Sequence, residues 1–521
     1  MATNLSIAEM TTNLFLHHKT LSLIALPNIQ TRDVSWVAAV GILFGLLVVY
    51  SVGWMVYNLW FHPLRHFPGP IEARATRIWY CRKLLSGRVS FDIGDMHNKY
   101  GDVVRIGPDE LSFRDPAAWS DIYGFRPGKG EVVKDPTFYD VTSSGNLSII
   151  GADTKRHGEL RRLMAHSYSD RALRDQLPVI KSYGDLFMSK LRELSKTSDE
   201  PIDMVKWFNF LTFDVIGDLA FGESFDCLQN SEYHTWISIV FDNIKLSAYL
   251  RCTLYYPKFI RPLLKLFIPK ELTAHRADHM KMTREKAIHR LEMKTNRIDL
   301  LARLAAPGSG ISQNEFVSNS GTVIVAGSDT TANLLAGVTH FLSQNKRCYN
   351  KLAEEIRTAF KSEDEITLVA VNQLPYLTAC LTEALRRYPP TPAHLPRRTN
   401  MDDTLAGHFV PKDTTVSITH VVMYLSEKHF RRPLEFIPER WLDDPEFASD
   451  KREAFQPFSF GPRACIGRNL AYIEMRLTIA RLIFNFDFEC MPGYENWDLQ
   501  KIYLGWQKVP LPIKMHARNV D

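Results

Sequence analysis

The chain has few cysteines, and none of them stand as a close pair. Seven occur among the 521 residues, an odd number with no C-x-x-C spacing: Cys81, Cys227, Cys252, Cys348, Cys380, Cys465 and Cys490. A small disulfide-held scaffold needs an even, closely spaced set, and a structural zinc site needs clustered ligands. Both classes are therefore excluded, and the scattered thiols fit a reducing compartment.

The sequence also lacks linkers, repeats and a strong net charge. Its length alone would allow about three domains, but no Gly/Ser-rich or low-complexity tract separates any. The composition is that of a globular protein, with 45% hydrophobic and 23% charged residues. The formal net charge of +5 is too mild to indicate a nucleic-acid partner. We therefore expect one large catalytic domain that does not bind nucleic acid.

Charge is absent from residues 34–61, which read VSWVAAVGILFGLLVVYSVGWMVYNLWF. At about 1.5 Å per residue, a helix of this length exceeds a hydrocarbon layer of about 30 Å. A buried core helix is the alternative, but the length and uniform apolarity argue against it. A cleaved signal peptide is also disfavoured, because the apolar run is too long and too far from Met1. We predict a transmembrane anchor over residues 34–61.

The distribution of cations predicts the orientation of this anchor. Lys19 and Arg32 precede it, whereas five cations follow closely: Arg65, Arg74, Arg77, Arg82 and Lys83. The positive-inside rule then places residues 1–33 on the lumenal side and the remainder in the cytosol. Residues 62–70 contain three prolines and form a proline-rich hinge, because proline ends a helix. Residues 71–521 form the expected catalytic domain.

One stretch near the C-terminus carries chemistry, Phe458-Ser459-Phe460-Gly461-Pro462-Arg463-Ala464-Cys465-Ile466-Gly467. Apolar residues recur at helical spacing after it, at Leu470, Ile473, Leu477 and Ala480. Cys465 would therefore precede a helix N-terminus, where free N–H groups and nearby cations stabilise a thiolate. An ordinary buried thiol is the alternative, but the spaced pattern around the cysteine favours a thiolate ligand to haem iron.

The pattern F-x-x-G-x-R-x-C-x-G resembles the haem-binding loop of the cytochrome P450 superfamily. The proline-rich hinge at residues 62–70 resembles that of microsomal members, especially fungal ones, and the stretch Phe213–Gly222 is similar to one common in fungal members, which implies secondary metabolism. The resemblance implies that Cys465 is the axial iron ligand and that Phe458 packs on the macrocycle. It also implies that Gly461 and Gly467 permit a close approach of the backbone, and that Arg463 meets a propionate. The implied fold is predominantly α with small β-sheets (α+β), preceded by one N-terminal transmembrane helix.

A second stretch, Ala326-Gly327-Ser328-Asp329-Thr330-Thr331, lies within a long apolar segment over residues 316–344. Alone, it would be read as a helix start capped by Ser328 or Asp329. The resemblance implies instead that Ala326 and Gly327 lie beside the haem, where Gly327 lets the helix widen for dioxygen. Thr330 would hydrogen-bond the bound oxygen, and Asp329 would relay protons, since cleavage of dioxygen consumes two protons.

Three further positions are implied to contact the haem propionates. Family members often carry W-x-x-x-R near the position of His157 and Arg161. Arg161 keeps the spacing, whereas His157 replaces the tryptophan, which is the main departure from the pattern. Downstream, Arg397 is the expected propionate contact and Arg398 its rival.

Glu383 and Arg386 form an i, i+3 pair on a predicted helix, which in isolation would be a surface ion pair of little value. The segment Phe436-Ile437-Pro438-Glu439-Arg440-Trp441 follows some fifty residues later. Together they resemble the E-x-x-R helix and the P-E-R segment of the family. We expect Glu383, Arg386 and Arg440 to form a structural charge network.

The resemblance implies a monooxygenase with haem b that receives electrons from NADPH through a separate membrane-bound reductase and uses dioxygen. It further implies a single-pass protein of the endoplasmic reticulum membrane, in contact with the lipid bilayer. The substrate would be a lipophilic small molecule, such as a terpenoid or polyketide of fungal secondary metabolism. The alternatives are a desaturase, a ring-forming enzyme or an isomerase on the same scaffold, and more remotely a non-enzymatic haem-binding protein.

Overall fold

A computed structural model of the chain describes residues 36–142, 147–293, 297 and 299–519. The chain divides into two compact units, which meet in the sequence between Trp54 and Met55. Residues 1–33, predicted as a lumenal segment, lie outside the described residues.

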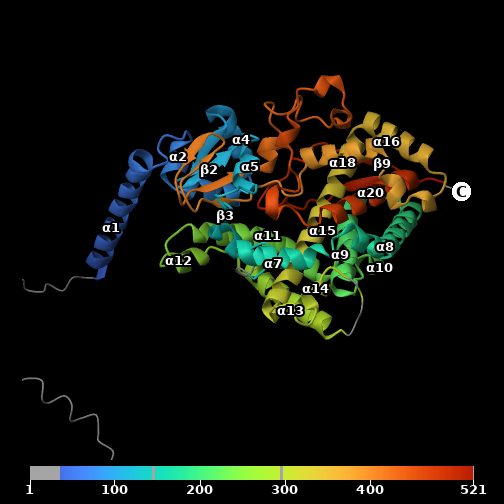
Figure 1. The fold of residues 1–521 in the computed structure, drawn as a ribbon, viewed down its shortest axis with the longest axis horizontal. Coiled ribbons are helices and arrows are strands. Elements are labelled where there is room, and N and C mark those ends of the chain that lie inside the picture. Colours follow the sequence, from blue (N-terminus) through green and yellow to red (C-terminus); the bar gives the residue numbers. More distant parts are fainter. Residues whose placement is uncertain (1–35, 143–146, 294–296, 298, 520–521) are drawn as a thin grey trace, which may run out of the picture. The chain divides into compact units, whose positions relative to one another are not determined.

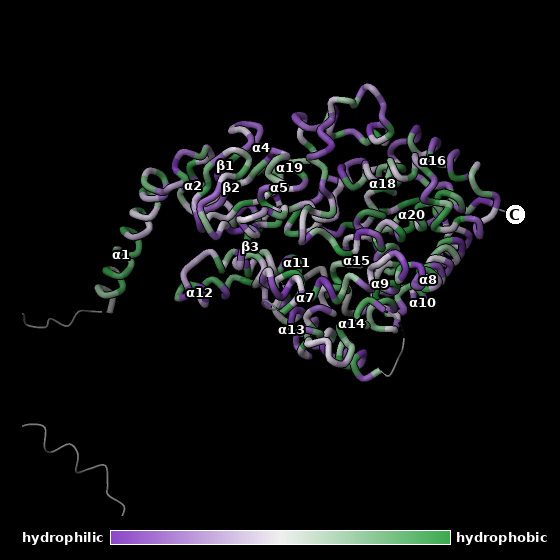
Figure 2. The backbone as a smooth tube through the Cα atoms, in the orientation of Figure 1, coloured by the Kyte–Doolittle hydropathy of each residue, from purple (hydrophilic) through white to green (hydrophobic). Residues whose placement is uncertain are grey.

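The N-terminal apolar helix is α1 (Trp36–Val56), which continues as one π-helical turn, η1 (Tyr57–Phe61). Residues Ala38–Phe61 are long and apolar enough to cross a membrane, and the most apolar stretch is not buried in protein. The alternative of a buried core helix is therefore wrong. Figure 2 shows the predominantly hydrophobic character of α1. The helix ends at His62 with an extended backbone, as expected of a residue that precedes a proline.

The second unit is built mainly from helices, which confirms the predicted fold class. The longer ones are α4 (Val89–Tyr100), α7 (Thr154–Ala165), α8 (Asp170–Thr197), α9 (Met204–Phe221), α11 (Thr235–Leu254), α13 (Lys270–Glu292), α15 (Gln313–Gln344), α16 (Lys346–Ala359), α18 (Pro375–Arg387) and α20 (Arg468–Asn485). Short helices connect them, and those used below are α3 (Ile78–Leu85), α5 (Ala118–Tyr123), α6 (Pro136–Thr142) and α12 (Arg261–Lys265).

Helix α15 is the central element of this unit (Figure 1), and it packs against α9, α13, α18 and α20. It begins with a capping box, in which the Ser312 hydroxyl accepts from the Glu315 N–H and the Glu315 carboxylate accepts from the Ser312 N–H. Its second half, from Thr331 to Leu342, is buried on all faces. Such a helix belongs to the core of a large domain rather than to a solvent-facing layer.

The strands form small sheets, and the largest has the order β1-β2-β8-β5-β3. Its members are β1 (Val103–Gly107), β2 (Glu110–Phe113), β8 (Thr415–Ile418), β5 (Arg397–Arg398) and β3 (Val133–Lys134). Only β2 and β8 run parallel; the other neighbours are antiparallel. The register of β3 with β5 sets Lys134 opposite Arg397, which brings two cations together at the edge of the sheet.

Two smaller sheets complete the described strands. One has the order β4-β10-β9, from β4 (Ile202–Asp203), β10 (Pro512–Ala517) and β9 (Phe486–Cys490), and the other pairs β6 (Asp403–Leu405) with β7 (His408–Val410). β4 directly precedes α9 and β9 directly follows α20, so the C-terminal strand β10 ties two core helices together.

Candidate functional site

The cysteine loop is held by its own backbone and by α5. The Cys465 N–H donates to the Phe458 carbonyl oxygen at 2.8 Å, and α20 begins at Arg468 with Gly467 as its N-cap. Gly461 adopts a left-handed backbone with φ of 73°. A Cβ atom at this position would overlap the carbonyl oxygen of Tyr123, at the end of α5. Gly461 therefore allows the backbones of the cysteine loop and of α5 to approach closely, which only glycine permits.

Cys465 differs from the other cysteines in its exposure. All seven lie in the described residues, and Cys465 alone has an exposed side chain. The surrounding protein still excludes enough water to raise the pKa of its thiol, whereas the Gly467 N–H and the charges of Arg161 and Arg468 lower it. Arg161 of α7 also donates to the Ala464 carbonyl oxygen at 2.7 Å. Burial outweighs these donors and cations, so the pKa of the free thiol lies above its ordinary value.

The flanking positions of the loop pack around the start of α20. The ring of Phe458 lies 5.3 Å from that of Tyr472, centroid to centroid, and the Arg468 guanidinium lies over it. An ideal Cβ placed on Gly467 would lie 3.9 Å from the Cys465 Sγ.

A cluster of cations lies beside this loop. Arg463 contacts the Glu131 carboxylate and donates to the Ala152 carbonyl oxygen at 2.8 Å. Arg397 donates to the same carboxylate at 2.8 Å, and its Nε has no hydrogen-bond partner among the described residues although it is buried. Burial, together with Arg397 and Arg463, holds the pKa of Lys134 well below its ordinary range. The cluster therefore holds more positive charge than its single carboxylate balances.

His157 lies in α7 beside this cluster and is 6% exposed. Burial lowers its pKa to about 4, and Arg463, Lys134 and Arg161 contribute in the same direction. The imidazole is therefore neutral at pH 7. Arg398, the rival of Arg397, is half-buried and pairs instead with Asp413 at 3.7 Å. Arg397 is thus the arginine of this pair that joins the cluster.

The polar residues of α15 line a cavity of about 720 Å³. Ala326, Asp329 and Thr330 all contribute to its wall, and the Thr330 hydroxyl donates to the Ala326 carbonyl oxygen at 2.7 Å. The rest of the wall comes from the preceding turns of α15 and from other segments, including Phe138, Leu395 and Leu504. The volume is typical of a site for a small organic ligand.

The environment of Asp329 was not predictable from the motif. Its Oδ1 lies 3.1 Å from the Lys508 Nζ, and its Oδ2 accepts from the Asn333 side chain at 3.1 Å. Lys508 also donates to the Asn209 side chain at 3.2 Å. Burial lowers the pKa of Lys508, and Asp329 raises it in opposition. The carboxylate is therefore tied to the segment that precedes β10.

The alternative reading of this stretch as a helix start is wrong. Ser328 lies in the middle of α15, and its hydroxyl donates to the Ile324 carbonyl oxygen at 2.7 Å. Gly327 lies close to α9, because a Cβ at this position would lie 2.6 Å from the Ile216 Cδ1. Any side chain at this position would require Ile216 to shift.

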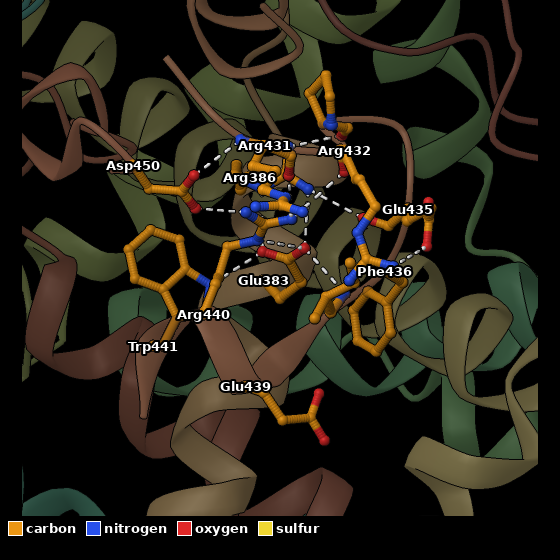
Figure 3. A network of polar contacts seen from close by, with 12 residues as sticks. Glu383, Arg386, Arg431, Arg432, Glu435, Phe436, Glu439, Arg440, Trp441 and Asp450 are labelled. Atoms are coloured by element: carbon orange, nitrogen blue, oxygen red, sulfur yellow. Dashed lines mark hydrogen bonds and ion pairs between the residues drawn. The ribbon is translucent and has the colours of Figure 1, made fainter. Parts of the chain in front are cut away.

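Glu383, Arg386 and Arg440 form a buried network (Figure 3). Glu383 accepts from Arg386 at 2.7 and 2.9 Å and from Arg440 at 3.1 Å. Arg386 also donates to the carbonyl oxygens of Tyr424, Pro433 and Glu435. Asp450, which lies outside both motifs, contacts Arg440, and the indole of Trp441, the last residue of the second motif, donates to Glu383. The network fixes the chain that leads to the cysteine loop.

Comparison with known proteins identifies the family. The family profile "Cytochrome P450" matches residues 65–515. The cytochrome P450 monooxygenase astJ of Aspergillus oryzae is 41% identical over 480 residues, which cover 91% of this chain and 96% of that protein. The trichothecene C-15 hydroxylase of Fusarium sporotrichioides is 41% identical over 482 residues, which cover 91% and 97%. The cytochrome P450 monooxygenase cpaH of Aspergillus oryzae is 42% identical over 475 residues, which cover 91% and 92%.

The chain therefore belongs to the cytochrome P450 family. It is an oxidoreductase of the fungal cytochrome P450 monooxygenase type. Membership implies haem iron, dioxygen, an organic substrate and a redox partner.

Proposed function

We propose that this protein is an NADPH- and dioxygen-dependent monooxygenase that hydroxylates a lipophilic small molecule of fungal secondary metabolism, such as a terpenoid or polyketide. Electrons reach it from a separate membrane-bound reductase. The observation that carries the proposal is the exposed thiol of Cys465, set among donors and cations in a loop of the family pattern. The apolar wall of the cavity that Thr330 lines supports a lipophilic substrate.

The residues present fit a haem group. Haem contains an iron atom, which needs an axial ligand, and two anionic propionates, which need cationic or hydrogen-bonding partners. The exposed Cys465 sulfur suits the first, and the excess of cations around Glu131 suits the second, with the unpartnered Nε of Arg397 as a ready donor. Arg463, Arg397, Arg161 and neutral His157 would hold the propionates. The other positions that would surround the macrocycle are Phe458, Gly461, Gly467, Ala326 and Gly327.

When bound through a thiolate, haem supplies the activation of dioxygen. This chain supplies the position of the substrate and the protons. Thr330 presents a hydroxyl to the cavity, and Asp329 lies next to it on the same wall. The ion pair between Asp329 and Lys508 fixes the direction of the Asp329 carboxylate. We infer that Asp329 and Thr330 are the catalytic pair through which protons enter the site.

The domain boundaries and location follow from the anchor. Residues 1–33 would be lumenal, residues 34–61 would span the endoplasmic reticulum membrane, residues 62–70 would be the hinge, and residues 71–521 would form the cytosolic catalytic domain. The single apolar helix supports an anchor. Protease treatment of sealed microsomes tests the orientation, since an N-terminal epitope should be protected while the catalytic domain is degraded. Digestion of the epitope, with survival of the catalytic domain, would contradict this orientation.

The decisive experiment uses membranes that hold this protein, a reductase and NADPH, supplied with a metabolite extract under isotopically labelled dioxygen. A compound that is consumed and reappears with one labelled oxygen atom supports the proposal. Consumption without label would indicate desaturation or ring formation if NADPH is required, and isomerisation if it is not.

The thiolate assignment is tested separately by substitution. Cys465→Ala should abolish the Soret band that marks thiolate-ligated ferrous haem with carbon monoxide. Cys490→Ala is the matched control, because that thiol is only partly exposed and lies on β9. A Cys465→Ala protein with an unchanged spectrum would contradict the assignment.

A further inference from the structure

The cavity beside Thr330 is elongated along α15. Its wall includes Asn314, in the first turn of this helix, and Thr330, sixteen positions later. At about 1.5 Å per residue these positions lie roughly 24 Å apart along the helix axis. The wall between them is formed by small or apolar side chains of α15, such as Val317, Gly321 and Val325. A ligand that reaches from one end to the other must therefore be long and largely apolar.

Arg284 of α13 donates to the Asn314 side chain at 3.3 Å, which brings positive charge to the end of the cavity away from Thr330. Lys281 lies about one turn before Arg284 on the same helix, and both side chains are exposed where they line the cavity. Arg276 of this helix lines the cavity as well. His279 lies among them, but burial, together with Arg276, lowers its pKa to about 4, so the imidazole adds no charge at neutral pH.

Asp278 and Glu285 lie near these cations on the exposed part of α13, but neither lines the cavity. Glu315, next to Asn314 in the sequence, pairs with Arg156 at 2.7 Å and caps α15 through Ser312. Asp329, the only carboxylate among the described residues of the cavity wall, lies at the opposite end and pairs with Lys508. The cavity is therefore apolar along its length, with an excess of positive charge at one end.

We propose that the substrate is a lipophilic molecule with an anionic group, most simply a carboxylic acid, whose charged end binds at Lys281 and Arg284 while its apolar end is oxidised near Thr330. The inference rests on the proposed function and specifies its substrate class. Arginine supplies a planar pair of donors that matches a carboxylate, and lysine adds a second charge. The long cavity keeps the acid group away from the oxidised carbon.

The test measures binding rather than turnover. The haem-loaded full chain is placed in nanodiscs of neutral phosphatidylcholine, and ligand binding is followed by the shift of the Soret band, with empty discs to correct for partition. The probes are two matched pairs, palmitic acid with methyl palmitate and abietic acid with methyl abietate. We expect at least one acid to bind about tenfold more tightly than its ester, the gain typical of one charge-assisted contact.

The variant Lys281→Gln/Arg284→Gln should remove this preference while it leaves the affinity for the ester unchanged. Lys270→Gln is the matched control, since Lys270 lies at the exposed start of the same helix and outside the cavity wall. The unchanged ester affinity shows that the double variant is folded. An equal loss for acid and ester would overturn the inference, as would a wild-type protein that binds both acids no more tightly than their esters.

A membrane lipid could supply the same anionic chemistry as a soluble acid. Discs that contain phosphatidylserine separate the two sources. A preference for the acid that persists in these discs supports a substrate site, whereas its suppression by phosphatidylserine assigns the charged end to a lipid headgroup and overturns the inference. The Soret band with carbon monoxide is recorded first, so that failure of thiolate ligation, which would refute the proposed function itself, is distinguished from failure of the acid site.

Discussion

The substitution Glu383→Gln should destabilise the protein strongly, because this carboxylate is the acceptor at the centre of the buried network. It accepts five hydrogen bonds, two from Arg386 and one each from Arg440, the Trp441 indole and the Ile437 N–H. The side chains of Glu383 and Arg386 are both 0% exposed. A glutamine would keep the volume, but it would remove the charge and point an NH₂ group at donors.

The magnitude follows from what is left behind. Removal of one partner from a buried ion pair costs about 3–5 kcal/mol, because the other charge stays buried without compensation. Asp450 still contacts Arg440 in the variant, so the uncompensated charge is that of Arg386. Its remaining partners are carbonyl oxygens, which solvate a guanidinium but do not neutralise it. We therefore expect the free energy of unfolding to fall by about 3–5 kcal/mol.

The assay is urea unfolding of the full chain in detergent, followed by near-ultraviolet circular dichroism. The control is Glu435→Gln, which removes another i, i+3 pair with arginine. Arg432 and Glu435 are 42% and 57% exposed, and such a pair contributes about 0–1 kcal/mol. If Glu383→Gln lowered stability no more than Glu435→Gln, the reasoning from burial would be refuted.

Three further predictions concern Glu474, a buried residue of α20, Gly461 of the cysteine loop and Thr330 of the cavity wall. Burial raises the pKa of Glu474 to about 8, so at neutral pH the folded protein holds a proton that the unfolded chain has lost. Between pH 6 and 8 the free energy of unfolding of the wild type should therefore fall by about 2 kcal/mol relative to Glu474→Gln. Parallel pH profiles of the two proteins in urea unfolding would contradict this. Gly461→Ala places a Cβ against the Tyr123 carbonyl oxygen at a positive φ, so it should lower the haem content of the purified protein severalfold, whereas Gly158→Ala, at a position with open space around it, should not. Thr330→Ala should leave NADPH oxidation running but lower the product formed per NADPH severalfold, and an unchanged ratio would remove Thr330 from the proton path.

The sequence marks out those parts of the candidate site that are contiguous in the chain. The loop around Cys465 and the stretch that contains Asp329 and Thr330 are short motifs, so they can be recognised without knowledge of tertiary packing, and the roles given to them stay predictions. The fold class was predictable because the family resemblance implied it, and the anchor because the apolar run at residues 34–61 is a local pattern. The family resemblance, carried by the same motifs, was confirmed by the comparisons.

Residues that join the site from distant segments were not predictable. Glu131 meets Arg463 across 332 positions, and it has no motif of its own. Lys508 pairs with Asp329 only because the segment before β10 returns to α15. The close approach of Ile216 of α9 to Gly327 likewise has no signal in the local sequence. Side-chain partners of this kind depend on tertiary packing, which local patterns do not encode.

The cations of the cavity wall belong to α13, whereas the cysteine loop is held by other segments of the chain. The loop that presents Cys465 is held by Gly461, Arg161 and the network of Glu383, none of which belongs to α13. Substitutions at Lys281 or Arg284 would therefore alter the ligands that the cavity accepts while the thiol loop stays intact. A fold divided in this way can diversify its chemistry in small steps, each of which leaves a functional oxidant in place.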